Sequence, residues 1–446
     1  MKTNPFRKSG PTAALAAVLL VLAAANANAK IDGLTGTTFN LTAKADLVQT
    51  PDGGSLLFWG YAPNDGTAQY PGPTFIVNQG DTITINLRNR LPVPVSIVFP
   101  GQEGVSASGG AAGVLTQDAP ADNGATTVTY TFTATHAGTY MYHSGTRADL
   151  EVEMGLVGAI IVRPYGFNPA SPRAYYHPST SYDREFLFLL TEMDPVVHDL
   201  VAAGQIDKVD TTKFWPNYWF INGRNAPDTL LDAYVPWLPT QPYNSAPTMH
   251  PGEKVLMRVA DAGRDLHPFH NHGNHARVFA QNGRLLESNP GVSGPDLSFL
   301  VFTFQAVPGQ TSDGVFEWTG ENIGWDVYGT GSAFAHTCNG IAVTAASPSS
   351  PGFDPVTKES CSDHGKPFPV ILPDNLSVTV GDMYSGSPFL GHLGQLPPGA
   401  GTQNLNGGYF FMWHSHTEKE IVNNDVFPGG MVTMLVIEAP SVPITE

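Results

Sequence analysis

Six histidines fall in two short segments of this sequence. Residues 267–279 read HPFHNHGNHARVF and carry four of them, and residues 410–431, FFMWHSHTEKEIVNNDVFPGGM, carry the other two. Histidines separated by one residue point to the same side of a β-strand, because side chains alternate between its faces with a period of two. Imidazole is a ligand for copper, zinc, iron and nickel. The two segments therefore indicate a metal site.

The pairs with this spacing are His270 with His272 and His414 with His416. Two such strands facing each other would place four imidazoles around one cavity. The ligand type does not by itself select copper among the metals that imidazole suits. The alternative is that these are polar residues on neighbouring surface strands.

The elements that must position these histidines are predicted to be strands. Residues 74–88, TFIVNQGDTITINLR, alternate apolar and polar residues as a half-buried strand pair does. Similar segments recur through both halves of the chain, and the 47 glycines and 38 prolines supply turns between short strands. No helical stripe of convincing length is present. We predict an all-β, predominantly antiparallel fold.

An internal repeat predicts two similar domains. Residues 138–164, GTYMYHSGTRADLEVEMGLVGAIIVRP, match residues 408–440, GYFFMWHSHTEKEIVNNDVFPGGMVTMLVIEAP. So wide a spacing indicates duplicated domains, because solenoid repeats have periods of about 20–50 residues. The expected parts are a signal peptide at 1–29, domain 1 at 30–165, a linker at 166–183, and domain 2 at 184–446 with an insertion at about 345–405.

The first 29 residues have the features of a secretory signal peptide. Three basic residues precede an uncharged apolar run that ends in Ala27-Asn28-Ala29. The run is too short to span a bilayer comfortably, since a spanning helix needs about 20 apolar residues. We predict cleavage before Lys30 and export to the periplasm or the extracellular space. No later segment is apolar enough to predict a membrane span.

The charge balance argues against nucleic acid as a partner. Without residues 1–29, 19 lysines and arginines remain against 39 aspartates and glutamates. Nucleic acid demands a basic face, because its phosphates are anionic. The acidic chain would tolerate metal ions or other cations, but its charge does not identify a partner.

The two cysteines, Cys338 and Cys361, are most simply interpreted as a disulfide in an exported protein. The bond would close a loop of about 24 residues and restrict the unfolded chain. Copper ligation by one of the thiolates is the alternative, but neither cysteine lies beside a histidine at a ligand spacing.

Several motifs, in matching order, resemble those of multicopper oxidases and related cupredoxin-fold proteins. YPGPTFIVNQGDTITINLRNRLP, residues 70–92, resembles their opening strands, and residues 141–162, MYHSGTRADLEVEMGLVGAIIV, the end of their first domain. NYWFINGRNAPDT, residues 217–229, resembles the start of a later domain. HPFHNH resembles their His-Pro-x-His-x-His-Gly copper motif, and MWHSHTEKEIVNNDVFPGGM the terminal His-x-His motif. The resemblance implies cupredoxin-like Greek-key β-sandwich domains that couple one-electron oxidations to reduction of dioxygen at copper.

The sequence departs from this family at the blue-copper ligands. The family's terminal motif has a cysteine between its two histidines, where this chain has Ser415, and Glu420 stands where a histidine is expected. Blue copper needs one cysteine and two histidines with a weak axial methionine. Of these, only His267 and Met431 remain. We therefore predict that a blue (type 1) copper centre is missing.

The polynuclear site is reduced as well. The family's first motif should fall in VPVSIVFPGQEG, residues 93–104, which contains no histidine. In the second motif His143 remains. It is interpreted as a ligand across a domain or subunit interface or as a core histidine. Two residues after it, at the place of a second histidine, the chain has Gly145. A full three-copper cluster in this family needs about eight histidines. The resemblance assigns five histidines of this chain to the site and leaves three more in reserve as less certain ligands. The five are His143, His270, His272, His414 and His416, and the reserves are His267, His275 and His392. One or two coppers of type 2 or type 3 are expected.

Two further clusters have a functional and a structural interpretation. The aromatic cluster FWPNYWF, residues 214–220, would suit a sugar or phenol platform but is interpreted as core and edge packing. Asp149, Glu151 and Glu153 alternate beside His143. They would bind a cationic substrate or guide protons, but are interpreted as a solvated strand edge.

Three functions remain open. The first is an exported copper oxidoreductase that takes electrons from a nearby reducing substrate, reduced metal ion or redox partner and passes them to dioxygen or a small oxidant. The second is a copper-binding protein without turnover, used for storage, delivery or sequestration. The third is a structural β-sandwich protein with a vestigial site. Two-domain members of the resembled family commonly build copper sites between subunits, which makes a homotrimer the expected assembly.

Overall fold

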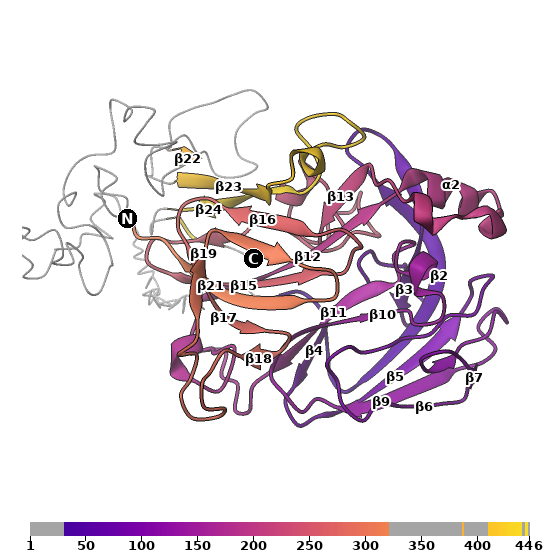
Figure 1. Cartoon of the computed structure of the whole chain (residues 1–446), viewed down its shortest axis with the longest axis horizontal. Helices are drawn as coiled ribbons and strands as arrows, with labels where there is room; N and C mark the ends of the chain where they lie inside the picture. Colours follow the sequence, from indigo (N-terminus) through magenta and orange to yellow (C-terminus); the bar gives the residue numbers. More distant parts are fainter. Residues whose placement is uncertain (1–30, 321–385, 388–408, 439–441, 445–446) are drawn as a thin grey trace, which may run out of the picture.

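A computed structural model of the chain describes residues 31–320, 386–387, 409–438 and 442–444 (Figure 1). The expected signal peptide, Cys338 and Cys361 with their expected disulfide, His392 and nearly all of the expected insertion at 345–405 lie outside these residues. Strands dominate the part that is described, and the predicted all-β fold class is confirmed. None of the described helices is long and apolar enough to cross a membrane.

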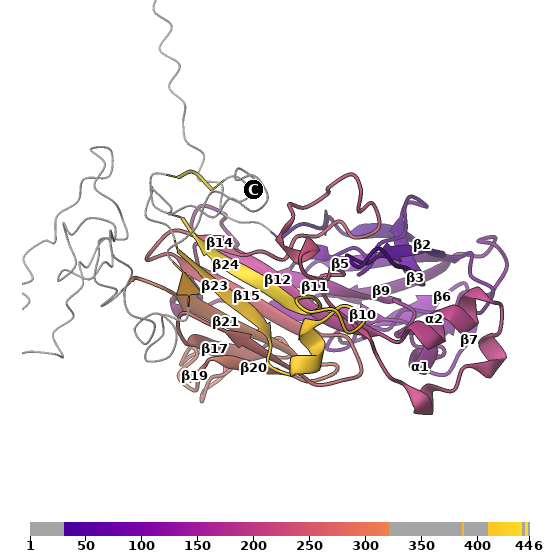
Figure 2. The ribbon, with the colours of Figure 1, turned by 90° about the horizontal axis from the view of Figure 1, so that it is seen from above.

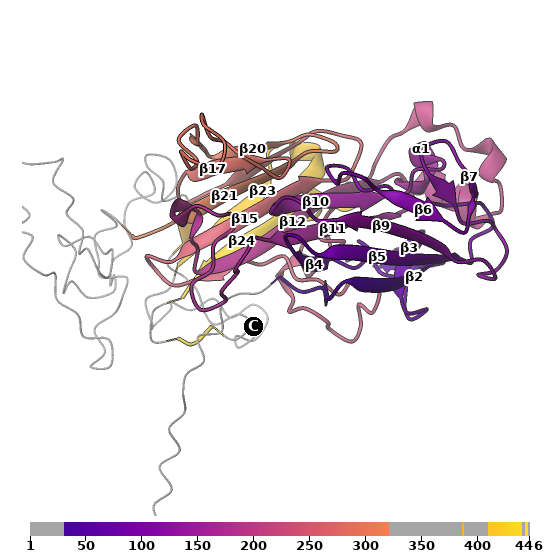
Figure 3. The same cartoon turned by 90° about the horizontal axis from the view of Figure 1, so that it is seen from below.

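The first half of the chain forms two sheets that pack face to face (Figure 3). Apolar side chains that alternate along each strand meet between them, such as Ile85 on one sheet and Tyr142 on the other. One sheet has the order β1 (Leu34–Thr35), β4 (Phe75–Asn78), β11 (Val157–Arg163), β10 (Gly138–His143). The other has the order β3 (Ser55–Pro63), β2 (Thr38–Gln49), β5 (Thr82–Asn89), β9 (Val128–Thr133), β6 (Ser106–Ser108), with a small hairpin of β7 (Ala111–Ala112) and β8 (Gln117–Asp118) beside it.

The second half repeats the two-sheet arrangement (Figure 2). Phe188 and Met257 of one sheet pack in the same core as Phe269 and Trp413 of the other. The first of these sheets has the order β13 (Tyr218–Ile221), β12 (Arg184–Met193), β15 (Lys254–Asp261), β21 (Thr311–Glu317), β17 (Ala276–Gln281), β18 (Arg284–Leu285), with β19 (Phe299–Val301) beside β17. The second has the order β14 (Thr248–Met249), β24 (Val432–Ile437), β23 (Tyr409–Ser415), β16 (His267–Asn271), β20 (Thr303–Ala306), with β22 (Gly386–Ser387) beside β23.

The strand pair predicted at residues 74–88 does form two strands, but they do not pair with each other. β4 joins one sheet of the first sandwich and β5 the other. A turn in which the amide of Asp81 donates to the carbonyl of Asn78 carries the chain across, with Gly80 at a φ of +92° that favours glycine. Most pairs are antiparallel, as predicted. However, five of the described pairs are parallel, among them β2 with β5 and β12 with β15.

In the described part of the chain, helices are few and short. They are α1 (Ala148–Glu151), α2 (Pro195–Ala202) and the 3-10 turns η1 (Pro178–Thr180), η2 (Ile206–Lys208), η3 (Thr211–Lys213), η4 (Asp228–Leu230) and η6 (Glu418–Ile421). α2 begins where Asp194 accepts a hydrogen bond from the amide of Val196 and Pro195 fixes the first turn. The segment expected to link the domains, 166–183, joins β11 to β12, and its residues Tyr175 and Tyr182 are buried. The domain boundaries themselves stay a prediction.

A buried ionic network joins the two halves. Arg163 of β11 forms an ion pair with Glu185 of β12, and the Nε atom of Arg258 on β15 lies 3.1 Å from the same carboxylate. Arg258 also donates to the hydroxyl of Thr139, which in turn donates to Asp313 over 2.6 Å. All of these groups are buried, so each charge depends on its partners.

Candidate metal centre

Two neighbouring strands of the second sandwich carry the histidine pairs. In β16 the buried residues are His267, Phe269 and Asn271, and the residues between them are less buried. His270 and His272 therefore face the opposite side of the sheet from His267. β16 runs antiparallel to β23 with His270 opposite His414, so the two motifs, more than 140 residues apart in the sequence, meet in one place.

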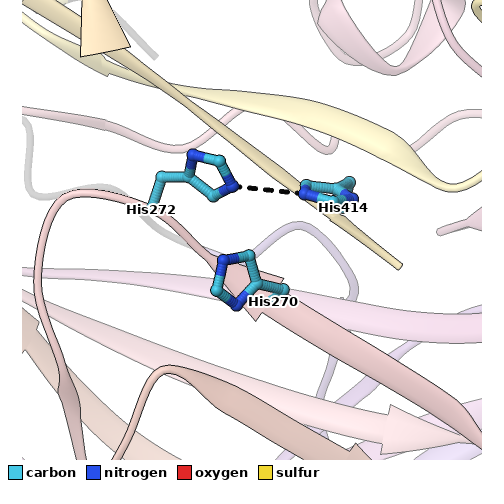
Figure 4. Close-up of side chains that lie close together, drawn as sticks. All are labelled: His270, His272 and His414. Atoms are coloured by element: carbon cyan, nitrogen blue, oxygen red, sulfur yellow. Dashed lines mark hydrogen bonds between the residues drawn. The ribbon is translucent and has the colours of Figure 1, made fainter. Parts of the chain in front are cut away.

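Three imidazoles converge there (Figure 4). His270, His272 and His414 each offer one nitrogen, and these three atoms all lie within 4.8 Å of one another. The Nε2 atoms of His272 and His414 are 3.2 Å apart. Among the described residues, this is the one group of three or more histidine, cysteine or acidic side chains so arranged.

Two of the three imidazoles have a hydrogen-bond partner at Nδ1, which leaves Nε2 as the nitrogen for a metal. Nδ1 of His414 must donate to the carbonyl of Ser415, 2.6 Å away, which leaves a lone pair on Nε2. Nδ1 of His270 lies 2.9 Å from the hydroxyl of Thr303. Burial, reinforced by the neighbouring imidazoles, lowers the pKa of His270 to about 4. Burial likewise lowers the pKa of His414 to about 4. Both rings are therefore neutral at pH 7, the form in which imidazole binds metals.

The spacing of the nitrogens fits a metal. Imidazole nitrogens bind a first-row ion such as zinc at about 2.0–2.1 Å, so two of them lie roughly 3 Å apart around it. The 3.2 Å between the Nε2 atoms of His272 and His414 agrees with that separation. The donor set is all nitrogen, which suits copper or zinc better than magnesium or calcium.

His416 borders this group from the exposed side. Its ring centroid lies 5.1 Å from that of His270 and 5.4 Å from that of His414. It comes from the same strand end as His414, and its amide donates to the carbonyl of Pro268 on β16. The four alternating histidines predicted to share a cavity thus lie together, and three of them offer nitrogens within 4.8 Å of one another.

His143 lies at the equivalent strand end of the first sandwich and is not a member of the group of three. Its Nδ1 lies 2.9 Å from the carbonyl of Ser144, the same contact that His414 makes with Ser415. Burial lowers the pKa of His143. His143 therefore also presents Nε2 in a neutral ring.

The strand pairing shows where the other ligands would stand in the first sandwich. Val98 pairs with His143 as His270 pairs with His414. Two residues on, Pro100 takes the place of His272. Gly145 takes the place of His416, and a Cβ there would approach Val98 to 2.6 Å. One histidine of four thus remains in this sandwich.

His267 is held between two carboxylates on the inner face of the sheet. Its Nδ1 lies 2.9 Å from Glu420 and its Nε2 2.9 Å from Glu192. Although burial alone would lower the pKa of His267, the hydrogen bonds and charges of Glu192 and Glu420 raise it well above its usual value. With both nitrogens bonded and the ring positively charged, His267 has no lone pair for a metal. We therefore leave it out of the proposed ligand set, although the resemblance placed it in reserve.

Ser415 belongs to the same inner network. Its hydroxyl donates to Glu420 over 2.5 Å, and the amide of Thr417 donates to it. The three positions of the family's blue-copper ligands thus hold a histidine, a serine and a glutamate that bond to one another. Glu192, which completes the network from β12, was not singled out from the sequence. Its apolar neighbours in the 184–193 strand gave no signal for a buried charge.

His275, a second of the three reserves, is exposed and lies outside the group. Its ring packs against Phe302, with centroids 5.3 Å apart. Phe302 also contacts the ring of His270, at 5.7 Å. We assign His275 no ligand role.

The acidic residues after His143 do not form the strand edge that their alternation suggested. They lie on α1 and the turn after it, where Glu151 and Glu153 are buried and Asp149 is exposed. Glu151 accepts a 2.5 Å hydrogen bond from Ser144, and burial raises its pKa to about 6. A four-residue helix has no period-2 pattern, so the alternation was a coincidence of spacing.

In the aromatic cluster 214–220, Tyr218, Trp219 and Phe220 are buried, as the packing interpretation predicts. Trp215 differs, since it is 67% exposed and the Nζ atom of Lys419 lies 3.6 Å from the centre of its ring.

Comparison with known proteins agrees with the motifs. The profile of the family described as Multicopper oxidase matches residues 64–166. The chain is 27% identical over 225 residues to a protein of Kuenenia stuttgartiensis named "Probable nitrite reductase-hydroxylamine oxidoreductase fusion protein", covering 48% of this chain and 22% of that one. It is 42% identical over 98 residues to Multicopper oxidase MCE of Talaromyces pinophilus, covering 22% and 15%. The solved multicopper oxidase mgLAC shares its fold, with a TM-score of 0.53 and 18% identity over 93% of this chain and 89% of that one.

Residues 64–166 are thus similar to a domain of multicopper oxidases, and the chain shares its fold with solved multicopper oxidases. The matches to the first two curated relatives span only 22% and 15% of their lengths, so they do not transfer a whole protein's activity. The second sandwich carries the histidine pairs of the two segments that resemble copper motifs of that family.

Proposed function

We propose that the protein is an exported, copper-dependent oxidoreductase of the multicopper oxidase type that works without a blue copper. One observation carries the proposal, which is the convergence of His270, His272 and His414 at two strand ends with their nitrogens within 4.8 Å of one another. Export rests on the sequence of residues 1–29.

The proposed ligands are His270, His272 and His414, with His416 at the open side. The geometry admits several imidazole-binding metals, and the similarity to multicopper oxidases favours copper. One or two ions fit these residues better than a full set of four. Copper bound there would supply one-electron chemistry toward dioxygen or another small oxidant. Thr303 and the carbonyl of Ser415 hold two rings with Nε2 toward the site.

The absence of a blue copper is proposed from the residues at its expected position. A serine hydroxyl does not replace a soft thiolate. The histidine there is bonded through both nitrogens to carboxylates. Electrons would therefore enter from a substrate, a reduced metal ion or a redox partner bound close to the half-exposed histidines.

We also propose that His143 contributes to a copper site between subunits of a homotrimer. Two facts support this. His143 presents a neutral ring at the position equivalent to His414, without its own ligand partners. Phe302, whose ring contacts that of His270, is 56% exposed, and Phe299 and Leu300 shortly before it in the chain are 45% and 65% exposed, so large apolar side chains near this site are open to a subunit contact. Sedimentation of the purified protein tests this, and a monomer at micromolar concentration would contradict it.

Oxygen uptake tests the enzymatic proposal. The copper-loaded protein is expected to consume dioxygen with a phenol or with Cu(I) as the reductant, and His414→Ala should abolish that consumption. Copper bound in a defined ratio with no turnover over a broad set of reductants would favour a storage or delivery protein instead.

A further inference from the structure

Behind the histidine group, four buried side chains link the strands that carry it. They are Glu192 at the end of β12, His267 at the start of β16, Ser415 at the end of β23 and Glu420 in η6. We call these four residues the inner clamp. Their side chains lie on the core side of the sheet, whereas His270 and His272 lie on its other side.

The contacts form one chain of hydrogen bonds. Ser415 donates to Oε2 of Glu420, 2.5 Å away, and the same oxygen lies 2.9 Å from Nδ1 of His267. Nε2 of His267 lies 2.9 Å from Oε2 of Glu192. The other oxygen of Glu192 accepts the amides of Arg264 and Asp265, at 2.5 and 3.2 Å. Three separate elements are thereby tied to β12.

The inner clamp includes Ser415, whose backbone carbonyl orients the proposed ligand His414. The carbonyl of Ser415 accepts the Nδ1 proton of His414, so any rotation of the Ser415 peptide turns that imidazole. One residue further, the amide of His416 donates to the carbonyl of Pro268, next to His267. The inner clamp holds Ser415 and His267 on the core side of the sheet. It therefore also holds His270 opposite His414 on the other side.

We propose that the inner clamp is a metal-independent device that positions the copper-ligand pairs. Glu192, His267, Ser415 and Glu420 are positioning residues, since none of them faces the histidine group. The proposal rests on the function proposed above for its copper role. A buried imidazolium between two carboxylates suits the purpose, because loss of either partner leaves an unpaired buried charge.

Two variants and two matched controls test the clamp. Ser415→Ala removes one hydroxyl, and Glu420→Gln removes one buried charge. Ser245→Ala removes a buried hydroxyl that donates to the carbonyl of Ile221, and Glu185→Gln removes a buried charge from the network between the halves. Both controls lie outside the clamp and lose contacts of the same kind.

Copper binding is measured first, in the full mature chain with Cu(II) as the only ligand. The clamp variants should weaken Cu(II) affinity about tenfold and change the hyperfine splitting of the paramagnetic spectrum, as loss of an outer-shell partner does. The control variants should keep the wild-type spectrum, even if their thermal stability falls as far. Unchanged affinity and spectrum in folded Ser415→Ala and Glu420→Gln would overturn the proposal.

Amide hydrogen exchange in the metal-free chain separates the clamp from the copper proposal. The amide of His416 should exchange about five to ten times faster in the clamp variants than in the controls, because a hydrogen bond contributes about 1 kcal/mol. If the wild-type chain binds no copper, the proposed function fails, while this exchange measurement still decides the clamp. Exchange no faster than in Ser245→Ala would refute the clamp in either case.

Discussion

The Nε2 atoms of His272 and His414 lie 3.2 Å apart, although 142 positions separate the two residues in the sequence. That distance results from the pairing of β16 with β23, which sets His270 opposite His414 and leaves His272 just beyond the end of the ladder. Two imidazoles at this separation are arranged as neighbouring ligands of one ion.

The first prediction separates the histidines of the HPFHNHGNH segment. His272→Ala should weaken copper binding by more than about 100-fold, because losing even an outer-shell partner costs about 10–100-fold. His275→Ala, three residues away and outside the group, should bind copper as the wild-type chain does. Titration with Cu(II) against a competing chelator measures both. Equal losses in the two variants would show that the ligands have been assigned to the wrong histidines.

The second prediction concerns the residues at the position of the missing blue copper. Ser415→Cys combined with Glu420→His restores a thiolate and a second imidazole beside His267, with Met431 buried in the same core. The double variant should gain an intense blue absorption when copper is added, and Ser415→Cys alone should gain a weaker one. A colourless copper-loaded double variant would mean that this position does not have the geometry of a blue-copper site.

A third prediction concerns the buried ionic network between the halves. Glu185→Ala removes the carboxylate that pairs with both Arg163 and Arg258, so the free energy of unfolding should fall by about 3–5 kcal/mol. Arg90→Ala breaks an exposed pair with Asp65 and should cost at most about 1 kcal/mol. Chemical denaturation measures both. Equal costs would show that the buried network contributes no more than a surface ion pair.

The fourth prediction is a dependence on pH. Burial raises the pKa of Asp261 to about 8, with His267 acting in the opposite direction. Between its usual pKa near 4 and pH 8 the folded chain therefore binds a proton that the unfolded chain has lost, so this group lowers stability as the pH rises. Asp261→Asn should be more stable than the wild type at pH 8 and gain little at pH 4. A gain that does not change with pH would contradict the assignment.

Much of this molecule follows from local patterns in its sequence. Period-2 alternation identifies the strands, and the spacing of His270, His272, His414 and His416 identifies the residues that meet. What local pattern cannot supply is the pairing of strands distant in the chain. For that reason residues 74–88 were expected to form a strand pair, although β4 and β5 join different sheets.

The inner clamp shows the same limit. Ser415 and Glu420 were recognised as departures from a motif, but their bonds to His267 and Glu192 depend on three-dimensional packing. A buried carboxylate such as Glu192 has no sequence signature of its own, since charged residues in apolar strands are usually exposed. Its partner becomes visible only when β12 and β16 are placed in space.

Metal analysis of the purified mature protein, combined with its optical and paramagnetic spectra, tests the central claim most directly. One or two coppers per chain are expected, with a paramagnetic or coupled signal from nitrogen ligands and no intense blue absorption. An intense blue band would contradict the assignment of Ser415 and Glu420. A chain that binds no copper, or binds another metal in its place, would contradict the proposed function itself.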